Sequence, residues 1–325
     1  MAKRKIVLYT VIPDDLKQRL MEHFEVISFA GIDQNNYQNF ITALSEAEGL
    51  IGSGVSIKGE VLSKAKQLKA ISTISVGYDY FSVEELTARN IRLMHTPGVL
   101  TDTTADLIFA LLLTTARRIV ETSEFIHQGR WTESIDSSLF GVDVHHKKIG
   151  ILGMGNIGEA VAKRAYCGFD MEVLYFSRQR KPAVEQKYQA IWCELDQLLK
   201  QADFVCITLP LTSDTENLIT REKLALMKSS SILINGGRGK IIDEDALIEA
   251  LQTKQILGAG LDVFVQEPLP TNSALLTLPN VVLAPHIGSA TFETRYKMAA
   301  LAVENLIAAL QPEKPKHNLV NKEVD

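Results

Sequence analysis

The feature that most constrains this chain is a glycine-rich stretch, Gly153-x-Gly155-x-x-Gly158, which joins an apolar strand at residues 149–152 to a helical stretch at residues 159–167. In this order the first glycine allows a tight turn, the second lets a pyrophosphate approach the backbone, and the third lets the helix lie close to the strand. Unpaired N–H groups at the helix start, together with the helix dipole, attract phosphate. The stretch predicts a dinucleotide-binding βαβ unit; the alternative is a tight turn that binds nothing.

Short apolar strands alternate with amphipathic helices on both sides of this turn. The strands that we expect lie at residues 6–11, 26–30, 49–54, 70–75, 91–95, 149–152, 172–176, 190–193, 204–209, 231–235, 260–264 and 281–284. Apolar strands linked by helices predict parallel sheets that are covered on both faces. The sequence therefore predicts an α/β chain of two Rossmann-like domains with doubly wound parallel sheets.

Two long helices frame the second series of strands. Cap-forming residues at positions 101–106 predict the start of a helix that runs to about residue 126. Its apolar stripe is broad, which indicates burial between two domains, and we place the domain boundary just before it, near Pro97. The last helix is expected at residues 291–310, where the proline-containing stretch 311–316 ends it.

Composition excludes several classes of protein. A chain of 325 residues with 46% hydrophobic content predicts two domains, and a net charge of −5 argues against bulk nucleic-acid binding. The longest apolar run, residues 107–113, is too short for a membrane span, and the chain begins with a strand where a signal peptide would lie. We expect a cytoplasmic protein. The three cysteines lack metal-ligand spacing, so we expect buried free thiols and no metal site.

The loop after the strand at 172–176 bears on which cofactor binds. NAD-specific folds usually place Asp or Glu about 20 residues past the glycines, to bind the ribose 2′-hydroxyl. Here the loop offers Ser177, Arg178 and Arg180 and no carboxylate. Guanidinium groups suit a 2′-phosphate, although two arginines can also simply solvate a loop. The sequence predicts NADP(H) in preference to NAD(H).

Three further stretches carry reactive side chains, and each follows a predicted strand. They contain Arg238 in Asn235-Gly-Gly-Arg238, Glu267 before Pro268, and His286 after Pro285. Open α/β sheets bind ligands at the carboxyl ends of their strands, so these three side chains are expected to converge beside the cofactor. Taken singly, each also fits an ordinary exposed loop residue.

These stretches, with Ser75-Val-Gly-Tyr-Asp79 and Leu209-Pro210-Leu-Thr212, resemble the D-isomer-specific 2-hydroxyacid dehydrogenases over almost the whole chain. The resemblance implies a flavodoxin-like substrate-binding domain, residues 1–100 and 290–325, with an inserted NAD(P)-binding domain, residues 101–289. Residues 73–79 and 143–146, with the basic cofactor loop, resemble the bacterial glyoxylate/hydroxypyruvate reductase branch, also called 2-ketogluconate reductases.

The resemblance also implies roles for the site residues. His286 would donate a proton to the keto oxygen of the substrate and take it back in the reverse reaction, as an imidazole can near neutral pH. Glu267 would bind the other ring nitrogen and favour the charged ring. Arg238 would bind the substrate carboxylate and polarise the carbonyl, and the N–H groups of Val76 and Gly77 would bind the other side of the carboxylate.

The expected cofactor contacts come from the glycine turn, the basic loop and the resemblance. Asp262 would bind the nicotinamide amide, and Thr104 stands where relatives often have Val. The full set is Thr104, Gly153, Gly155, Asn156, Ile157, Gly158, Ser177, Arg178, Arg180, Leu209, Pro210, Thr215, Gly236, Gly237, Asp262, His286 and Gly288.

The activity that the resemblance implies is NADPH-dependent reduction of small 2-keto acids (glyoxylate, hydroxypyruvate and 2-keto-D-gluconate) to D-2-hydroxy acids. The alternatives are another D-2-hydroxyacid dehydrogenase, of phosphoglycerate or lactate type, and a nucleotide-sensing corepressor-like binding protein. The expected partner is a small-molecule substrate, with neither nucleic acid nor membrane. The apolar interdomain helix and Leu139-Phe140 in the loop after it favour a symmetric homodimer.

Overall fold

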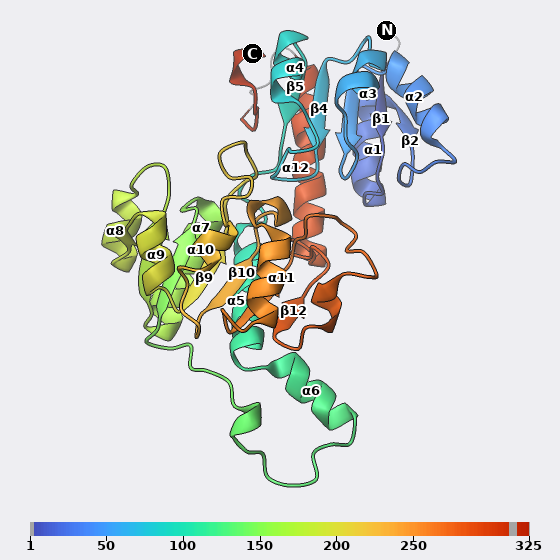
Figure 1. The fold of residues 1–325 in the computed structure, drawn as a ribbon. Coiled ribbons are helices and arrows are strands. Elements are labelled where there is room, and N and C mark those ends of the chain that lie inside the picture. The colour runs from blue at the N-terminus through green and yellow to red at the C-terminus, as the bar shows by residue number, and fades with distance from the viewer. Residues whose placement is uncertain (1–2, 312–316, 325) are drawn as a thin grey trace. The chain divides into compact units, whose positions relative to one another are not determined.

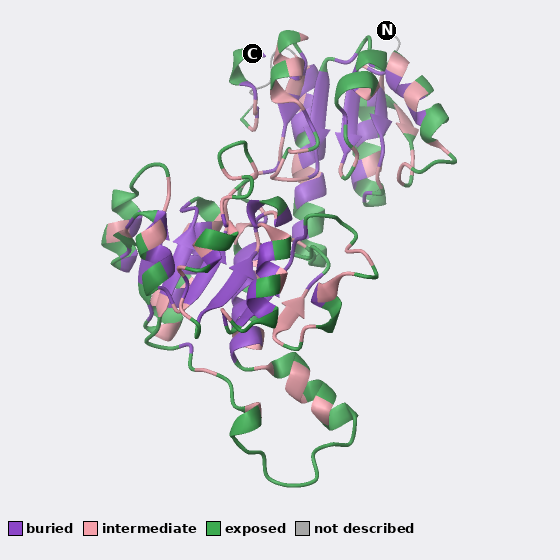
Figure 2. Ribbon diagram, in the orientation of Figure 1, coloured by how far each residue is buried: buried purple, intermediate pink, exposed green. Residues whose placement is uncertain are grey.

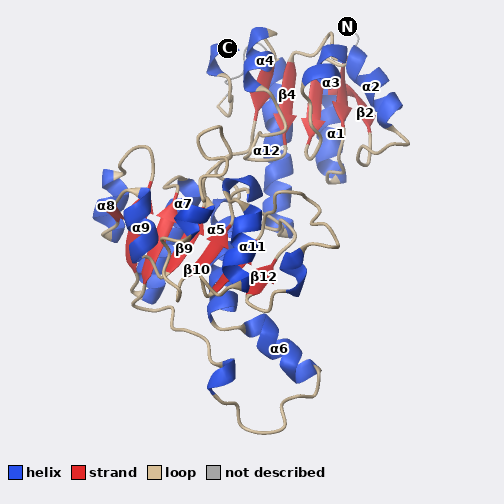
Figure 3. Cartoon of the chain, in the orientation of Figure 1, coloured by secondary structure: helices blue, strands red, loops and turns tan. Residues whose placement is uncertain are grey.

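The computed structural model describes residues 3–311 and 317–324. The chain divides into two compact units, one formed by Met1–Leu100 with Ala290–Asp325 and the other by Thr101–Ser289. In each unit helices cover both faces of a parallel sheet (Figures 1 and 3). The predicted class, an α/β chain with two doubly wound parallel sheets, is confirmed.

The first unit contains a five-stranded sheet with the order β2-β1-β3-β4-β5, the flavodoxin-like order. Its elements are β1 (Arg4–Leu8), α1 (Asp14–His23), β2 (Phe24–Ser28), α2 (Tyr37–Glu46), β3 (Gly49–Gly52), α3 (Gly59–Lys64), β4 (Ala70–Thr73), α4 (Val83–Ala88), β5 (Arg92–Met94), α12 (Phe292–Leu310) and the 3-10 turn η4 (Lys322–Val324). Helices α2, α3 and α4 share one apolar core with the sheet.

The end of the chain is part of this first unit. Helix α12 packs on β3, β4 and β5, and the buried Ser72 hydroxyl of β4 donates a hydrogen bond to the carbonyl oxygen of Ala302 at 2.7 Å. After the helix, the Asn321 side chain accepts the N–H of Leu93 at 2.9 Å and donates to the carbonyl of Ile91 at 2.8 Å. These bonds attach the C-terminal segment to the edge strand β5.

The second unit contains a seven-stranded parallel sheet with the order β12-β11-β10-β9-β6-β7-β8. Strand β6 lies between β9 and β7, where the direction of the connections reverses, and this is where open α/β sheets bind ligands. The elements are α5 (Thr101–Ala116), α6 (Ile119–His127), η1 (Ser137–Leu139), β6 (Lys148–Leu152), α7 (Asn156–Phe169), β7 (Glu172–Phe176), α8 (Pro182–Tyr188), β8 (Ile191–Trp192), α9 (Leu195–Gln201), β9 (Phe204–Ile207), α10 (Arg221–Leu224), β10 (Ile232–Asn235), η2 (Gly239–Ile241), α11 (Glu244–Gln252), β11 (Gly258–Leu261), η3 (Ala274–Thr277) and β12 (Val281–Leu283).

Alternation along the strands explains why both faces of this sheet are covered. Ile149 and Ile151 of β6 point into the core beneath α5, α7 and α8, whereas Leu152 belongs to the core beneath α9, α10 and α11. Because successive strand residues face opposite sides, a strand that is apolar throughout must be buried on both. Figure 2 shows the central strands of the sheet as buried along their length.

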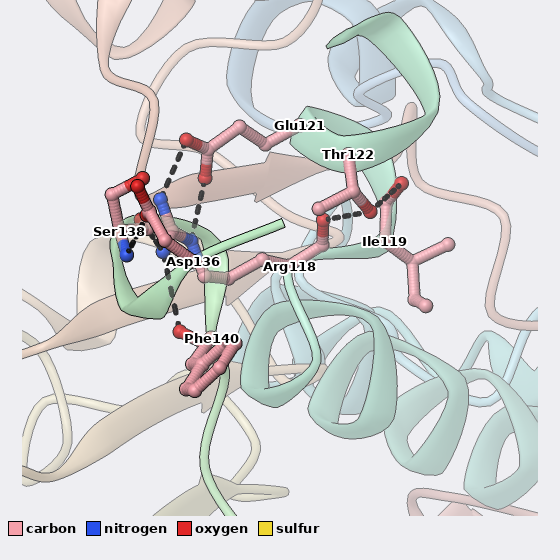
Figure 4. Close-up of polar contacts among 7 residues, drawn as sticks. All are labelled: Arg118, Ile119, Glu121, Thr122, Asp136, Ser138 and Phe140. Atoms are coloured by element: carbon pink, nitrogen blue, oxygen red, sulfur yellow. Dashed lines mark hydrogen bonds and ion pairs between the residues drawn. The ribbon is translucent and has the colours of Figure 1, made fainter. Parts of the chain in front are cut away.

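The prediction of a single helix over residues 101–126 is wrong. Helix α5 ends at Ala116 and α6 starts at Ile119, because Arg118 adopts the left-handed conformation, with φ 52° and ψ 38°. Its guanidinium group forms a bidentate pair with Glu121, at 2.7 and 2.8 Å, and donates to the carbonyls of Ser138 and Phe140, at 2.5 and 3.2 Å (Figure 4). The apolar spacing continues across the break, so the sequence did not reveal it.

Residues 117–147, which we call the arm, project from the second unit (Figure 1). Helix α6 has no buried residue, and the chain returns where the N–H of Val142 donates to the carbonyl of Ala116 at 2.9 Å. Six large apolar side chains of the arm are more than half exposed: Ile119, Val120, Ile126, Trp131, Ile135 and Phe140. The arm therefore carries an apolar surface that the described chain leaves uncovered.

Other expectations need correction. Cys193 and Cys206 are buried, but the expected burial of Cys167 is wrong, because it lies on the exposed side of α7. Helix α3 is short, and Ile57 just before it forms a bridge with Phe81. Helix α12 ends at Leu310 as expected, while residues 312–316 of the predicted breaker lie outside the described residues. No helix among the described residues is long and apolar enough to cross a membrane.

Candidate active site and cofactor loop

His286 and Glu267 form a hydrogen-bonded pair in the second unit. The ring Nδ1 of His286 lies 2.7 Å from Glu267 Oε2, and the other carboxylate oxygen accepts the N–H of Phe264 at 3.0 Å. Because an ionised carboxylate can only accept, Nδ1 carries the proton of this bond and Nε2 is the nitrogen left for a ligand. The two side chains are 46% and 30% exposed, so a small molecule can reach them.

The carboxyl group of Glu267 is ionised at neutral pH. Burial alone raises its pKa, but the hydrogen bonds from His286 and the Phe264 N–H outweigh burial, and the charges of His286 and Arg238 add to them. The net pKa of Glu267 therefore lies below its ordinary value. The hydrogen bond from Nδ1 to this carboxylate fixes the orientation of the His286 ring.

Asp262 binds the backbone directly after His286. Its side chain is only 3% exposed, and its two oxygens accept the N–H groups of Ile287 at 2.7 Å and Gly288 at 2.9 Å. His286 itself has φ 54°, a left-handed conformation that costs a non-glycine residue about 1–2 kcal/mol. The two hydrogen bonds stabilise this turn, a role that the sequence reasoning missed when it assigned Asp262 to the nicotinamide.

Gly288 lies between Asp262 and a second predicted cofactor residue, Thr104 of α5. A β-carbon on Gly288 would stand 3.2 Å from Asp262 Oδ2 and 3.3 Å from Thr104 Cγ2. Burial raises the pKa of Asp262, opposed by the two N–H groups and by the charge of His286. The structure therefore brings Thr104, Asp262 and Gly288 together beside the His286 turn.

Arg238 follows strand β10, the neighbour of β11 in the sheet. The Asn235 side chain closes the turn before it, accepting the N–H of Gly237 and donating to the carbonyl of Arg238, each at 3.0 Å. A β-carbon on Gly239 would lie 1.9 Å from the carbonyl carbon of Phe264, so the Arg238 and Glu267 loops are in direct contact. Thus Arg238, Glu267 and His286, far apart in sequence, are collected at one edge of the sheet. Asn235, which sequence reasoning did not select, is signalled only by its place before two glycines.

The glycine turn has the local geometry that a pyrophosphate needs. Gly153 has φ 101°, and a β-carbon on Gly158 would lie 2.1 Å from the carbonyl oxygen of Gly153, so neither position accepts a side chain. A β-carbon on Gly155 would meet nothing within 4 Å, which leaves an open approach to the backbone. Helix α7 starts at Asn156, followed by Ile157, and among the described residues no side chain caps it.

The remaining predicted cofactor residues form the rim beside this turn. The Leu209 backbone lies against Gly153, and a β-carbon on Gly237 would stand 2.8 Å from the carbonyl oxygen of Leu209. The hydroxyl of Thr215 donates to the carbonyl of Pro210 at 2.6 Å and closes the loop after β9. Gly236 packs on Ile108 of α5, where a β-carbon would approach within 2.5 Å.

The two arginines of the basic loop after β7 differ in their contacts. Arg180 forms a bidentate ion pair with Glu185, with nitrogen–oxygen distances of 2.6 and 3.0 Å. Arg178 is exposed, and none of the described residues accepts a hydrogen bond from its guanidinium group. The Ser177 hydroxyl donates to the carbonyl of Gln179 at 2.6 Å and shapes the loop.

Val76 and Gly77 belong to the first unit. The carbonyl of Val76 is hydrogen-bonded to Nδ1 of His95 at 3.0 Å, and that of Gly77 accepts the Ser75 hydroxyl at 2.6 Å. Within the described residues, the N–H groups of Val76 and Gly77 donate to no protein acceptor. Two adjacent unpaired donors remain suited to an anion. Among the described residues no group of three or more His, Cys, Asp or Glu is placed to hold a metal ion.

The chain is similar in sequence to known proteins. The sequence model described as the NAD binding domain of D-isomer specific 2-hydroxyacid dehydrogenases matches residues 109–288. A protein from Yersinia pestis named glyoxylate/hydroxypyruvate reductase B is 60% identical over 322 residues, which cover 99% of this chain and 98% of that protein.

Solved structures share the whole fold. The TT0316 protein of Thermus thermophilus is 42% identical, with a TM-score of 0.88 and coverage of 98% of this chain and 99% of that one. The NADPH-dependent glyoxylate/hydroxypyruvate reductase of Sinorhizobium meliloti, solved with NADP and malonate, is 29% identical, with a TM-score of 0.86 and coverage of 99% and 98%. On the family match, the near-complete coverage and the fold, this chain belongs to the D-isomer specific 2-hydroxyacid dehydrogenases, a family of oxidoreductases, and carries their NAD-binding domain.

Proposed function

We propose that this protein reduces small 2-keto acids, glyoxylate and hydroxypyruvate among them, to D-2-hydroxy acids with NADPH. The observation that carries the proposal is the His286–Glu267 pair at 2.7 Å, beside the Arg238 loop in a unit that belongs to an oxidoreductase family. The relatives named above support the choice of substrates, since one is a glyoxylate/hydroxypyruvate reductase B and another is NADPH-dependent with the same substrates.

The site residues divide the chemistry between them. The bound nicotinamide would supply the hydride that reaches the keto carbon. His286 delivers a proton to the keto oxygen from Nε2, while Glu267 holds Nδ1 and orients the ring. Arg238 binds the substrate carboxylate and polarises the carbonyl, so the developing oxyanion meets a fixed positive charge. The N–H groups of Val76 and Gly77 stay the predicted second donors for the carboxylate.

The residues present fit a dinucleotide with a 2′-phosphate. Gly155 leaves the backbone open at the start of α7, where helix N–H groups favour a pyrophosphate. Arg178 extends from the next loop without a protein partner among the described residues, and no carboxylate there takes the place expected for a 2′-hydroxyl ligand. We therefore propose NADP(H) in preference to NAD(H), with the cofactor held by residues 101–289.

Initial-rate reduction of glyoxylate and hydroxypyruvate, each with NADPH and NADH at equal concentration, tests this function. We expect turnover with both acids and a higher kcat/KM for NADPH. Arg178→Ala should raise the KM for NADPH and leave that for NADH unchanged, while Arg221→Ala, an exposed arginine on α10, should change neither. Equal losses with both cofactors would make Arg178 a structural residue, and no turnover with any 2-keto acid would replace the reductase by a nucleotide-binding role.

We also propose that two copies of the chain associate through the arm. A nine-residue helix that buries nothing, such as α6, is not stable alone in water, and a monomer rarely exposes so many large apolar side chains together. A second copy offers the same surface, so a symmetric pair covers both arms at once. Light scattering after gel filtration should give a dimer, which Ile119→Glu with Ile126→Glu should dissociate. Met21→Glu, at an exposed apolar residue of α1, is the control and should leave the mass unchanged.

A further inference from the structure

Glu185 of α8 accepts three hydrogen bonds from two side chains of the strand and loop before it. Its Oε1 accepts the phenol of Tyr175 at 2.5 Å and Nε of Arg180 at 3.0 Å, and its Oε2 accepts Nη2 of Arg180 at 2.6 Å. The side chain of Glu185 is 18% exposed, whereas that of Arg180 is 67% exposed. The carboxylate is thus a fixed, largely covered anchor, and the guanidinium group is held on its solvent side.

The loop itself is fastened from neighbouring strands. The indole N–H of Trp192, on β8, donates to the carbonyl of Ser177 at 3.1 Å, and the N–H of Lys181 donates to the Tyr175 phenol at 2.7 Å. Hydrogen bonds from Arg180, and next from Tyr175, lower the pKa of Glu185 to about 2. Arg180 and Glu185 therefore form a neutral pair at every pH at which the enzyme would work.

We propose that Glu185 is a specificity-determining residue: it cancels the charge of Arg180, so that Arg178 is the loop cation that meets a 2′-phosphate, and it thereby limits how strongly NADPH is preferred over NADH. The inference rests on the proposed use of NADPH and deepens it. It also departs from the sequence prediction, in which Arg178 and Arg180 both contact the phosphate.

The competing possibility is that Arg180 leaves Glu185 and binds the phosphate directly. That exchange would leave the Glu185 carboxylate, which is 18% exposed, without its cation. Separating such a pair costs more than separating an ion pair on an open surface. It would also break two charge-assisted hydrogen bonds with near-ideal distances. The neutral pair therefore stays intact when the cofactor binds.

A double-mutant cycle on the full-length protein separates the two possibilities. The dissociation constants of NADPH and NADH are measured by calorimetry for the wild type, Glu185→Gln, Arg180→Gln and the double variant. Glutamine keeps the shape and a hydrogen-bond acceptor for Tyr175 but removes the charge. Removing one negative charge near a doubly charged phosphate should tighten NADPH binding roughly three- to tenfold in dilute buffer, and added salt should reduce the gain. Arg180→Gln should weaken NADPH binding by a similar factor.

The double variant gives the decisive result. Because it removes the pair without changing the net charge, it should bind NADPH within about twofold of the wild type, with NADH unchanged in all four proteins. A double variant as weak as Arg180→Gln alone would show that Arg180 binds the phosphate itself and would overturn the inference. Equal weakening of NADPH and NADH by Glu185→Gln would overturn it too, by making Glu185 an anchor of loop structure.

A remote control and the wild type complete the design. Glu249→Gln breaks the ion pair of Arg221 with Glu249 in the same unit and should change neither dissociation constant. Equal binding of NADPH and NADH by the wild type would refute the proposed cofactor preference. In that case the role of Glu185 would still be tested by whether Glu185→Gln tightens or weakens NADPH binding. Failure of the cofactor preference and failure of the Glu185 inference can therefore be told apart.

Discussion

Replacing Asp262 by Asn tests whether this buried carboxylate positions His286 or only contacts the cofactor. In the structure its oxygens accept two backbone N–H groups, those of Ile287 at 2.7 Å and Gly288 at 2.9 Å, directly after a histidine in the left-handed conformation. Asparagine is nearly the same size but has a single acceptor oxygen. Its NH₂ group would face one of the two N–H donors, so one of the two hydrogen bonds must be lost.

The magnitude follows from that loss. A hydrogen bond to a charged acceptor contributes about 1.5–3 kcal/mol, and an N–H left without a partner in a buried place adds to the cost. We expect Asp262→Asn to destabilise the His286 turn by about 2–4 kcal/mol. If the loss appears as a smaller population of the productive turn, kcat should fall roughly 30- to 900-fold, since about 1.4 kcal/mol corresponds to a factor of ten.

Steady-state reduction of glyoxylate, with thermal unfolding as a check on the fold, measures this effect. Asp203→Asn is the matched control, because Asp203 also accepts a backbone N–H, that of Lys148 at 2.9 Å, but on the start of β6. The control should lower stability and leave kcat unchanged. A value of kcat within threefold of the wild type for Asp262→Asn, with a raised KM for NADPH, would refute the positioning role and leave only a cofactor contact.

Three further substitutions give four more predictions. Glu267→Gln removes the carboxylate that accepts the proton of His286 Nδ1, so kcat for reduction should fall while the fold is kept; an unchanged kcat would contradict the pair. The pKa of Glu267 in the fold lies below its ordinary value of 4.5, so ionised Glu267 stabilises the fold above that pH and this contribution is lost on acidification. Unfolding scans between roughly pH 5 and pH 3 should therefore show a smaller loss of stability for Glu267→Gln than for the wild type. Arg238→Ala should lower kcat/KM on the order of a thousandfold or more, and near-normal turnover would remove it from the site. Arg118→Ala should speed hydrogen exchange at residues 137–140 and weaken the proposed dimer, with a local cost of about 1–3 kcal/mol because the guanidinium group is partly exposed; unchanged exchange would mean that Arg118 does not hold the arm.

Local patterns made much of the fold predictable. The order strand, glycine turn and helix at residues 149–167 requires only neighbouring residues, so its reading needed no tertiary contact. Arg238, Glu267 and His286 could be selected because each follows an apolar strand, and parallel strands end at one edge of a sheet. Cys167 could not be placed by its apolar neighbours, because the face of α7 that meets the sheet is set by packing.

Two of the features that escaped prediction depend on residues far apart in sequence, and a third depends on a local turn. The end of α5 is decided by Arg118 bonding to carbonyls about 20 residues later, and an unbroken apolar spacing hides that contact. The two N–H groups that Asp262 binds lie about 25 residues beyond it, after the next strand. The Arg180–Glu185 pair is close in sequence, but only the turn into α8 shows that the two charges meet.

The class of fold, the place of the dinucleotide turn and a set of candidate site residues could be predicted from the sequence, because strand periodicity and glycine stereochemistry are local properties of the chain. The tertiary structure was needed to show which of these side chains are neutralised by an ion pair, which are hydrogen-bonded in place and which stay exposed to a ligand. It pairs Glu267 with His286, binds the His286 turn to Asp262 and cancels Arg180 with Glu185, while Arg178 stays exposed. Interactions between charges and hydrogen bonds depend on the distances between atoms, and the packing of the sheets and helices sets these distances.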